Sequence, residues 1–187
     1  MHDLSILSIV IIIAVMLLFS AFFSGMEIAF LGRNRLREEI DRKQSPMFNY
    51  IADIFSRKSN NYITTILVGN NIALVIYSMC MAVIIGVCGI ENPLLQTIIS
   101  TIIILFIGEY IPKSVVRRNP NFYYSLFSPI IFFFYILLYP ITLFSTLLSY
   151  GLIRLTGRRI EQREEPTEFN RDDLASLVED ENVEVND

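Results

Sequence analysis

Histidine and cysteine are both scarce in this chain of 187 residues. The single histidine, His2, lies near the beginning, and the two cysteines, Cys80 and Cys88, share one apolar run. Their spacing fits neither a zinc ligand set nor a disulfide framework, so we interpret both cysteines as small buried apolar residues. No nucleophile, base and orienting group occur together, which argues against an enzyme. Nor do we expect a nucleic acid among its partners.

Charged residues are also few, at 18 %, whereas hydrophobic residues make up 53 % and the mean hydropathy is +0.50. The apolar residues gather into long runs, which a soluble domain of this length does not need. The sequence therefore predicts an all-α membrane protein in contact with lipid. We expect three transmembrane helices at about 4–31, 61–87 and 94–116, of which the first lacks the basic start and A-x-A cleavage site of a signal peptide.

Basic residues give the orientation of these spans. Seven lysines and arginines lie within residues 33–58, and none lies in the connection CGIENP that follows the second span. The positive-inside rule then predicts a multi-pass protein of the cell membrane (inner or plasma membrane) with its N-terminus outside and its C-terminus in the cytoplasm. Segment 33–58, broken at Ser45-Pro46, is predicted to be a pair of short cytoplasmic helices with one apolar face.

The fourth apolar segment, 122–155, has arginines at both ends and therefore conflicts with the same rule. Pro129 and Pro140 lie inside it, and each removes a backbone donor. We predict a Pro-kinked juxtamembrane belt helix that enters and leaves on one face; the alternative is a fourth span.

The last part of the chain, 161–187, differs in charge from the rest. It holds 11 acidic and 2 basic residues, against 8 acidic and 13 basic residues in 1–160. Segment 168–180 has the pattern of a short amphipathic helix, with Asn170 as its N-cap. We expect residues 1–160 to be the membrane domain and 161–187 to be an acidic cytoplasmic linker and tail helix leading to a soluble domain.

Polar clusters interrupt each of the three predicted spans. They are Ser20/Ser24/Glu27, Asn70/Asn71 and Glu109/Lys113. Ionised groups in a membrane are costly, which favours a functional interpretation. Counted from the cytoplasmic end of its own span at 1.5 Å per residue, Ser24 lies about 10 Å deep, Asn70 about 13 Å and Glu109 about 12 Å. Three segments thus bring oxygen ligands to one level.

The ligand types indicate a hard cation. Pro112 cannot donate to the carbonyl of Gly108, which leaves a free carbonyl beside the Glu109 carboxylate. Hydroxyl, amide, carbonyl and carboxylate oxygens suit Mg²⁺ or Ca²⁺. The predicted site comprises Ser20, Ser24, Asn70, Asn71, Gly108 and Glu109. Which asparagine binds the ion stays open.

Structural alternatives exist for these same residues. The serines are able to bond to their own helix, and the asparagines to join helices. Glu27 and Lys113 are candidate pathway or switch residues. Lys113 is expected either to pair with Glu109 when the site is empty or to extend to the membrane surface.

Four stretches are recognisable together: FFSGMEIAF, ILVGNNIAL, GEYIPKS and RDDLASLVED. In this order they resemble the DUF21 transmembrane domain of the CorC and cyclin M (CNNM) magnesium transporter family. The resemblance covers nearly the whole chain and implies a homodimer that exports Mg²⁺, coupled to Na⁺ entry. It also implies that a CBS-pair module binding ATP lies outside this sequence. The rival hypothesis is a membrane scaffold or sensor in which the ion is structural and the tail recruits partners.

Overall fold

The computed structural model describes residues 2–155, which are almost entirely helical. The predicted all-α architecture is therefore confirmed for this part of the chain. In chain order the elements are α1 (His2–Leu31), α2 (Arg35–Gln44), α3 (Pro46–Arg57), α4 (Ser59–Val87), α5 (Pro93–Ile103), the π-helical segment η1 (Ile104–Tyr110), α6 (Ile111–Val116), α7 (Pro120–Leu137) and α8 (Tyr139–Leu155). The chain forms two compact units, of which the first ends at Leu148. The three rods, the helix pair and the polar residues described below belong to this first unit. The predicted tail helix at 168–180 lies outside the described residues.

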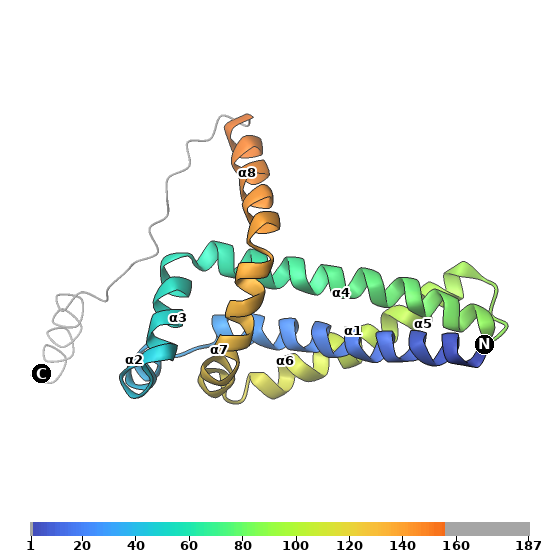
Figure 1. Ribbon diagram of the computed structural model, residues 1–187, viewed down its shortest axis with the longest axis horizontal. Coiled ribbons are helices and arrows are strands. Elements are labelled where there is room, and N and C mark those ends of the chain that lie inside the picture. Colours follow the sequence, from blue (N-terminus) through green and yellow to red (C-terminus); the bar gives the residue numbers. More distant parts are fainter. Residues whose placement is uncertain (1, 156–187) are drawn as a thin grey trace, which may run out of the picture. The chain divides into compact units, whose positions relative to one another are not determined.

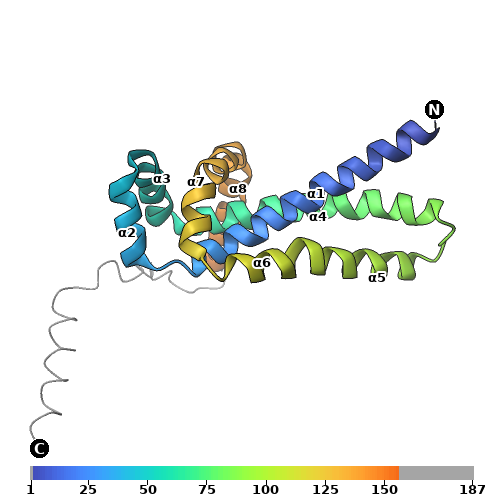
Figure 2. The same cartoon turned by 90° about the horizontal axis from the view of Figure 1, so that it is seen from below.

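Three helical rods run alongside one another: α1, α4, and the continuous series α5, η1 and α6 (Figures 1 and 2). Helix α1 packs mainly against α4 and also contacts η1 and α6. Each rod is long and apolar enough to cross a membrane. Many of their apolar side chains, such as Leu18, Met79 and Leu94, are exposed in the monomer, as expected for helices that face lipid.

A fourth helix, α7, also meets the length and composition of a span, but it is the shortest and least apolar of the four. Figure 1 shows that α7 and the beginning of α8 run across α1 and α4 rather than along them. Helix α7 continues through Pro129, and the helical chain breaks only at Leu138, before Pro140. Two kinks, one at each proline, were predicted. The structure instead has a single break at Leu138, which lies between Pro129 and Pro140 and close to Pro140.

Both helices of the pair α2 and α3 begin at a side-chain N-cap. Asn34 accepts hydrogen bonds from the backbone N–H groups of Leu36 and Arg37 at the start of α2. Ser45 caps α3 through the N–H of Phe48, and Pro46 occupies the first turn, where no amide donor is needed. The break at Ser45-Pro46 therefore ends one helix and begins the next.

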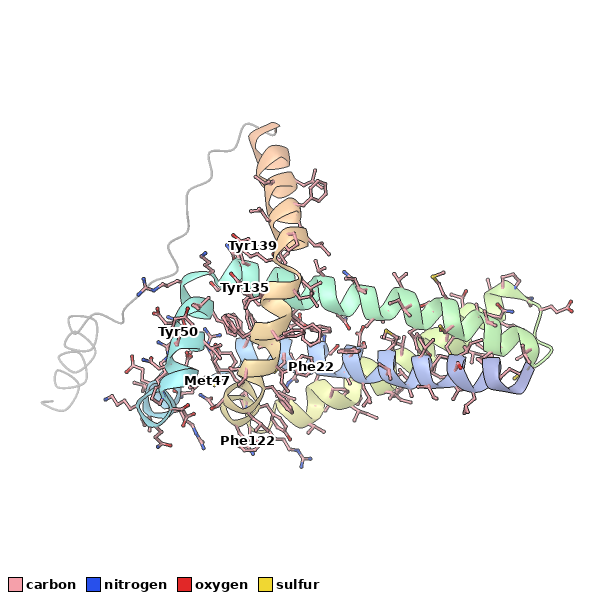
Figure 3. All side chains as sticks on the ribbon, viewed as in Figure 1. Phe22, Met47, Tyr50, Phe122, Tyr135 and Tyr139 are labelled. Atoms are coloured by element: carbon pink, nitrogen blue, oxygen red, sulfur yellow. The ribbon has the colours of Figure 1, made fainter. Side chains whose placement is uncertain are left out.

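Aromatic side chains fill the space where α7 crosses α1. Phe134 on α7 meets Phe22 and Phe23 on α1, and the ring centroid of Phe30 is 4.2 Å from that of Tyr62 on α4. Figure 3 shows side chains crowded between α7 and the rods, with Phe22 on α1 and Tyr135 on α7 among those labelled. This cluster fixes α7 against the end of the bundle that carries α2 and α3, because it buries large apolar areas from α1, α3, α4 and α7 together.

A buried carboxylate lies beside this aromatic cluster. Glu38 is 3 % exposed, and its two carboxylate oxygens contact Arg33 Nε at 2.8 Å and a terminal nitrogen of Arg42 at 2.6 Å. The Arg33 guanidinium also stacks over the ring of Phe30, 3.7 Å from its centroid. We call Arg33, Glu38 and Arg42 the Glu38 junction; in it each oxygen of the buried carboxylate is paired with an arginine.

Candidate metal site in the membrane helices

Ser20 is the point at which the three rods meet. Its side chain is fully buried, and its hydroxyl donates a hydrogen bond to Asn70 Oδ1 on α4 at 2.8 Å. On the third rod, a Cβ added to Gly108 would lie 3.0 Å from the Ser20 hydroxyl oxygen. Gly108 therefore lets the backbone of η1 approach Ser20 closely. The structure thus brings together one predicted site residue from each of the three rods.

Segment η1 interrupts the α-helical hydrogen bonding beside this meeting point. Its last π-type bond runs from the Ile111 N–H to the Phe106 carbonyl, and α6 begins with Tyr110 as its cap residue. Pro112 has no N–H, so this turn lacks the amide that would pair with the Gly108 carbonyl in an α-helix or with the Ile107 carbonyl in a π-helix. Backbone acceptors therefore outnumber donors across this turn, and in a membrane no bulk water makes up the difference.

Two further predicted ligands carry polar groups without partners. The Ser24 hydroxyl, one helical turn from Ser20, is buried and has no hydrogen-bond partner. Within residues 2–155 the Glu109 carboxylate has neither an ion-pair nor a hydrogen-bond partner. A buried polar group left without a partner costs roughly 1–3 kcal/mol, so the buried Ser24 hydroxyl is suited to receive a ligand, and the partly buried Glu109 carboxylate is available to bind one.

The two adjacent asparagines are placed differently. Asn70 is partly buried and accepts the hydrogen bond from Ser20, whereas the neighbouring Asn71 is exposed on the surface of α4. The sequence left open which of the two contributes to the site. Within this chain, Asn70 is the one that the structure joins to the other predicted ligands, and Asn71 faces away from them.

Lys113 contacts a different carboxylate from the one expected. Its Nζ lies 3.0 Å from Glu27 Oε2, which links α6 to α1. The anticipated pair between Lys113 and Glu109 is therefore not what the structure contains. Glu27 follows Ser24 by one helical turn, so this ion pair lies next to the polar cluster, toward the C-terminal ends of α1 and α6. Both side chains are partly exposed, at 32 % for Lys113 and 26 % for Glu27.

Small residues allow the rods to pack closely around these groups. A Cβ on Gly69 would lie 2.4 Å from the ring of Phe23, and one on Gly25 would lie 3.1 Å from a methyl group of Val116. Gly69 thus makes room for an aromatic ring, immediately before Asn70.

Among residues 2–155, no group of three or more His, Cys, Asp and Glu side chains is arranged to hold a metal ion. A zinc-type or multi-carboxylate site is thus missing from the described part of the chain. The groups that the structure brings together are the Ser20 hydroxyl, the Asn70 amide and the backbone at Gly108, and Glu109 follows Gly108 in the chain. Such a mixed set of hard donors is compatible with Mg²⁺, which commonly takes one or two carboxylates and keeps several waters.

The comparison with protein families agrees with the sequence motifs. The family model of the cyclin M transmembrane N-terminal domain matches residues 11–185, which is nearly the whole chain. The chain belongs to the cyclin M transmembrane family. This makes it a multi-pass membrane domain of the CNNM and CorC type, from proteins associated with Mg²⁺ transport. A search of curated proteins gives no match.

Sequence reasoning missed two features of this cyclin M domain. The first is the π-helical geometry of η1, for which the signal was present: a glycine and a proline four residues apart inside an otherwise apolar span. The second is the pairing of Lys113 with Glu27. No local signal identifies that partner, because Glu27 and Lys113 lie on different rods and meet only when the rods pack.

Proposed function

We propose that this cyclin M domain transports Mg²⁺ across the membrane through a site formed by Ser20, Ser24, Asn70, Gly108 and Glu109. The observation that carries this proposal is the convergence at Ser20, whose hydroxyl contacts Asn70 and lies against the backbone at Gly108. Transport, not catalysis, is the proposed activity.

The donor set suits an ion that has to be released again. One carboxylate gives the site modest charge, and neutral oxygens from the hydroxyl, amide and carbonyl groups complete it. Mg²⁺ loses its hydration water reluctantly, so we expect the bound ion to retain part of its shell. Conduction requires binding that is favourable enough for entry and weak enough for departure, which a single carboxylate with neutral partners provides.

The pairing of Lys113 with Glu27 supports this use of Glu109. Lys113 is four residues from Glu109 and is the nearest cation along the chain, so it would compete with Mg²⁺ if it paired there. Glu27 holds the ammonium group at 3.0 Å on α1 instead. In this arrangement Glu27 and Lys113 act as a switch at the mouth of the site.

The proposed membrane topology has three spans and a belt. The three rods would cross the bilayer, and α7 with α8 would lie at its cytoplasmic surface, because α7 runs across the rods and basic residues flank the segment at both ends. In this proposed topology the N-terminus lies outside the cell. Following the family resemblance, we propose a homodimer that exports Mg²⁺ in exchange for Na⁺, with the ion entering from the end where Glu27 and Lys113 lie.

Replacing Glu109 by glutamine tests the proposal. The protein is reconstituted into liposomes containing a Mg²⁺-sensitive dye, and Mg²⁺ flux is compared with stabilisation of the purified protein by Mg²⁺. We expect Glu109→Gln to abolish flux and to remove the Mg²⁺-dependent rise in melting temperature, because the variant lacks the only carboxylate of the site. Glu91→Gln, in the connection between α4 and α5, removes the same charge elsewhere and serves as the control.

The outcomes separate transport from the scaffold alternative. Flux in the wild type and the control but not in Glu109→Gln supports the transporter. A protein that binds Mg²⁺ through Glu109 but never moves it would instead fit a scaffold or sensor with a structural ion. If Glu109→Gln and Glu91→Gln respond to Mg²⁺ like the wild type, the polar cluster only joins helices, and the proposed site is wrong.

A further inference from the structure

A pocket of about 840 Å³, lined by none of the residues of the proposed ion site, lies where the end of α1, helix α2 and the connection from α6 to α7 meet. Its lining includes Gly32 and Asn34 from one side, and Asn119 to Phe122 from the other. Gly32 lies beside Pro120, since a Cβ at Gly32 would make an ordinary contact with the Pro120 ring at 3.5 Å. The pocket thus joins two segments that are far apart in the sequence.

The two sides of the pocket are held together by a pair of hydrogen bonds. The backbone N–H of Asn34 donates to Asn121 Oδ1 at 2.8 Å, and Asn121 Nδ2 donates to the backbone carbonyl of Asn34 at 2.9 Å. Asn121 is only 7 % exposed. Because this clamp satisfies the side-chain amide and the backbone together, the pocket is held in shape by the fold without any ligand.

Two arginines line the pocket without partners. Arg37 comes from α2 and Arg118 from the connection before α7, and within residues 2–155 neither side chain has a hydrogen bond or an ion pair. This contrasts with Arg33 and Arg42, which both bind Glu38, and with the exposed Arg57, which pairs with Asp53. One acidic residue, Asp41, also lines the pocket, so its side-chain charge is positive. Arginine guanidinium groups commonly bind phosphate in proteins, and here two of them are available.

The rim of the pocket is apolar and exposed. Leu36 and Ile40, one turn apart on α2, are 75 % and 57 % exposed, and Phe122 at the start of α7 is 58 % exposed. Figure 3 shows Phe122 on the outside of the first turn of α7. The apolar run of α1 ends at Leu31, immediately before the pocket begins at Gly32. The pocket therefore lies at a membrane boundary, with cationic groups and apolar side chains on the same opening.

We propose that this pocket binds the headgroup of an anionic phospholipid, with the phosphate between Arg37 and Arg118 and the acyl chains along Leu36, Ile40 and Phe122. A soluble phosphate compound would use the two arginines but would leave the apolar rim exposed to water. A lipid uses both features, and basic pockets at the ends of membrane helices are known positions for acidic headgroups. This inference is independent of the proposed ion site.

The test uses the detergent-purified protein and three probes: phosphatidylglycerol, phosphatidylcholine and glycerol 3-phosphate. For each probe we measure the concentration that produces half of the maximal rise in melting temperature. This is done for the wild type and for two double variants. Arg37→Gln/Arg118→Gln removes the pocket charges. Arg57→Gln/Lys58→Gln removes two positive charges from the exposed end of α3 and the chain that follows it, and is the matched control.

We expect phosphatidylglycerol to stabilise the wild type at lower concentrations than phosphatidylcholine does. Loss of both pocket arginines weakens this effect about twenty-five-fold, at about five-fold for each guanidinium, while the control variant changes little. Equal weakening in the two double variants, or none in either, overturns the proposal, because the attraction would then be general or located elsewhere. Stabilisation by glycerol 3-phosphate as strong as that by phosphatidylglycerol also overturns it, since the pocket would then take a soluble phosphate. Both double variants are first required to melt like the wild type without added lipid.

Discussion

Two carboxylates in this molecule have opposite surroundings. Glu38, at the junction of α1, α2 and α7, is almost fully buried, and each of its oxygens contacts an arginine. Glu109, in the π-helical segment of the third rod, has no ion-pair or hydrogen-bond partner within the described part of the chain. A satisfied carboxylate stabilises the fold, whereas one without a partner is available to a ligand. The difference distinguishes the region around Glu38, which we call the framework because it stabilises the fold, from the region around Glu109, where we propose the ion site.

The largest effect on stability is expected from Glu38→Gln. The change leaves Arg33 and Arg42 without their shared counter-charge in a nearly buried position, which costs about 3 kcal/mol or more. The melting temperature in detergent should fall sharply, and by the same amount with and without Mg²⁺. Asp53→Asn is the control, because it breaks an exposed pair with Arg57 worth less than about 1 kcal/mol. If added Mg²⁺ restored the stability of Glu38→Gln, the contrast between framework and site would be wrong.

An intermediate effect is expected from Gly108→Ala. The new Cβ would lie 2.7 Å from Ile104 Cδ1, the end of a side chain on the same rod, and 3.0 Å from the Ser20 hydroxyl oxygen on α1. The Ile104 side chain would have to rotate, and the contact between the third rod and Ser20 would loosen. We expect a loss of about 1–3 kcal/mol in stability. Mg²⁺ should also stabilise the variant less than the wild type, because the looser contact separates Gly108 from Ser20.

Gly86→Ala provides the matched control for this change. A Cβ at Gly86 meets its nearest atom at 3.8 Å, an ordinary contact, so stability and the response to Mg²⁺ should both be retained. A Gly108→Ala protein that binds Mg²⁺ like the wild type would show that close approach at Ser20 is not needed for the site.

The smallest effect is expected from Glu27→Gln, which releases Lys113. The ammonium group is then free to pair with Glu109 four residues away, and Mg²⁺ binding should weaken about two- to five-fold. Removing the lysine as well, in Glu27→Gln/Lys113→Gln, should restore binding. Calorimetric titration of Mg²⁺ into each variant measures this difference. A double variant as weak as the single one would mean that Glu27 acts on the ion directly and not through Lys113.

Much of the fold could be predicted from local chemistry. The helix pair follows from the Ser45-Pro46 break, because a serine cap followed by proline ends one helix and starts another. The belt, expected from arginines at both ends of 122–155, stays a prediction: α7 runs across α1 and α4 (Figure 1), but it also has the length and composition of a span. The position of the break in that segment could not be predicted. Proline removes one donor, and whether a helix continues through it depends on the packing around it.

The site was predictable in part. Counting residues from the ends of the spans was sufficient to bring Asn70 and Glu109 to a similar depth. The count used Ser24 for α1, and Ser20 was predicted to belong to the same site; the observed contact with Asn70 comes from Ser20, one turn further into the span. Depth along separate helices does not include tilt or rotation, and both are decided by how the rods pack.

The sequence by itself determined the class of protein, the polar residues available to an ion and the family to which the domain belongs, because apolar run lengths and motifs are properties of local chemistry. The tertiary structure decided that Asn70 and not Asn71 faces Ser20, that Lys113 pairs with Glu27, and that Arg37 and Arg118 line one pocket. Each of these is a meeting of segments distant in the chain. Such meetings depend on the rotation of whole helices, which the packing of aromatic rings and small residues sets across the bundle.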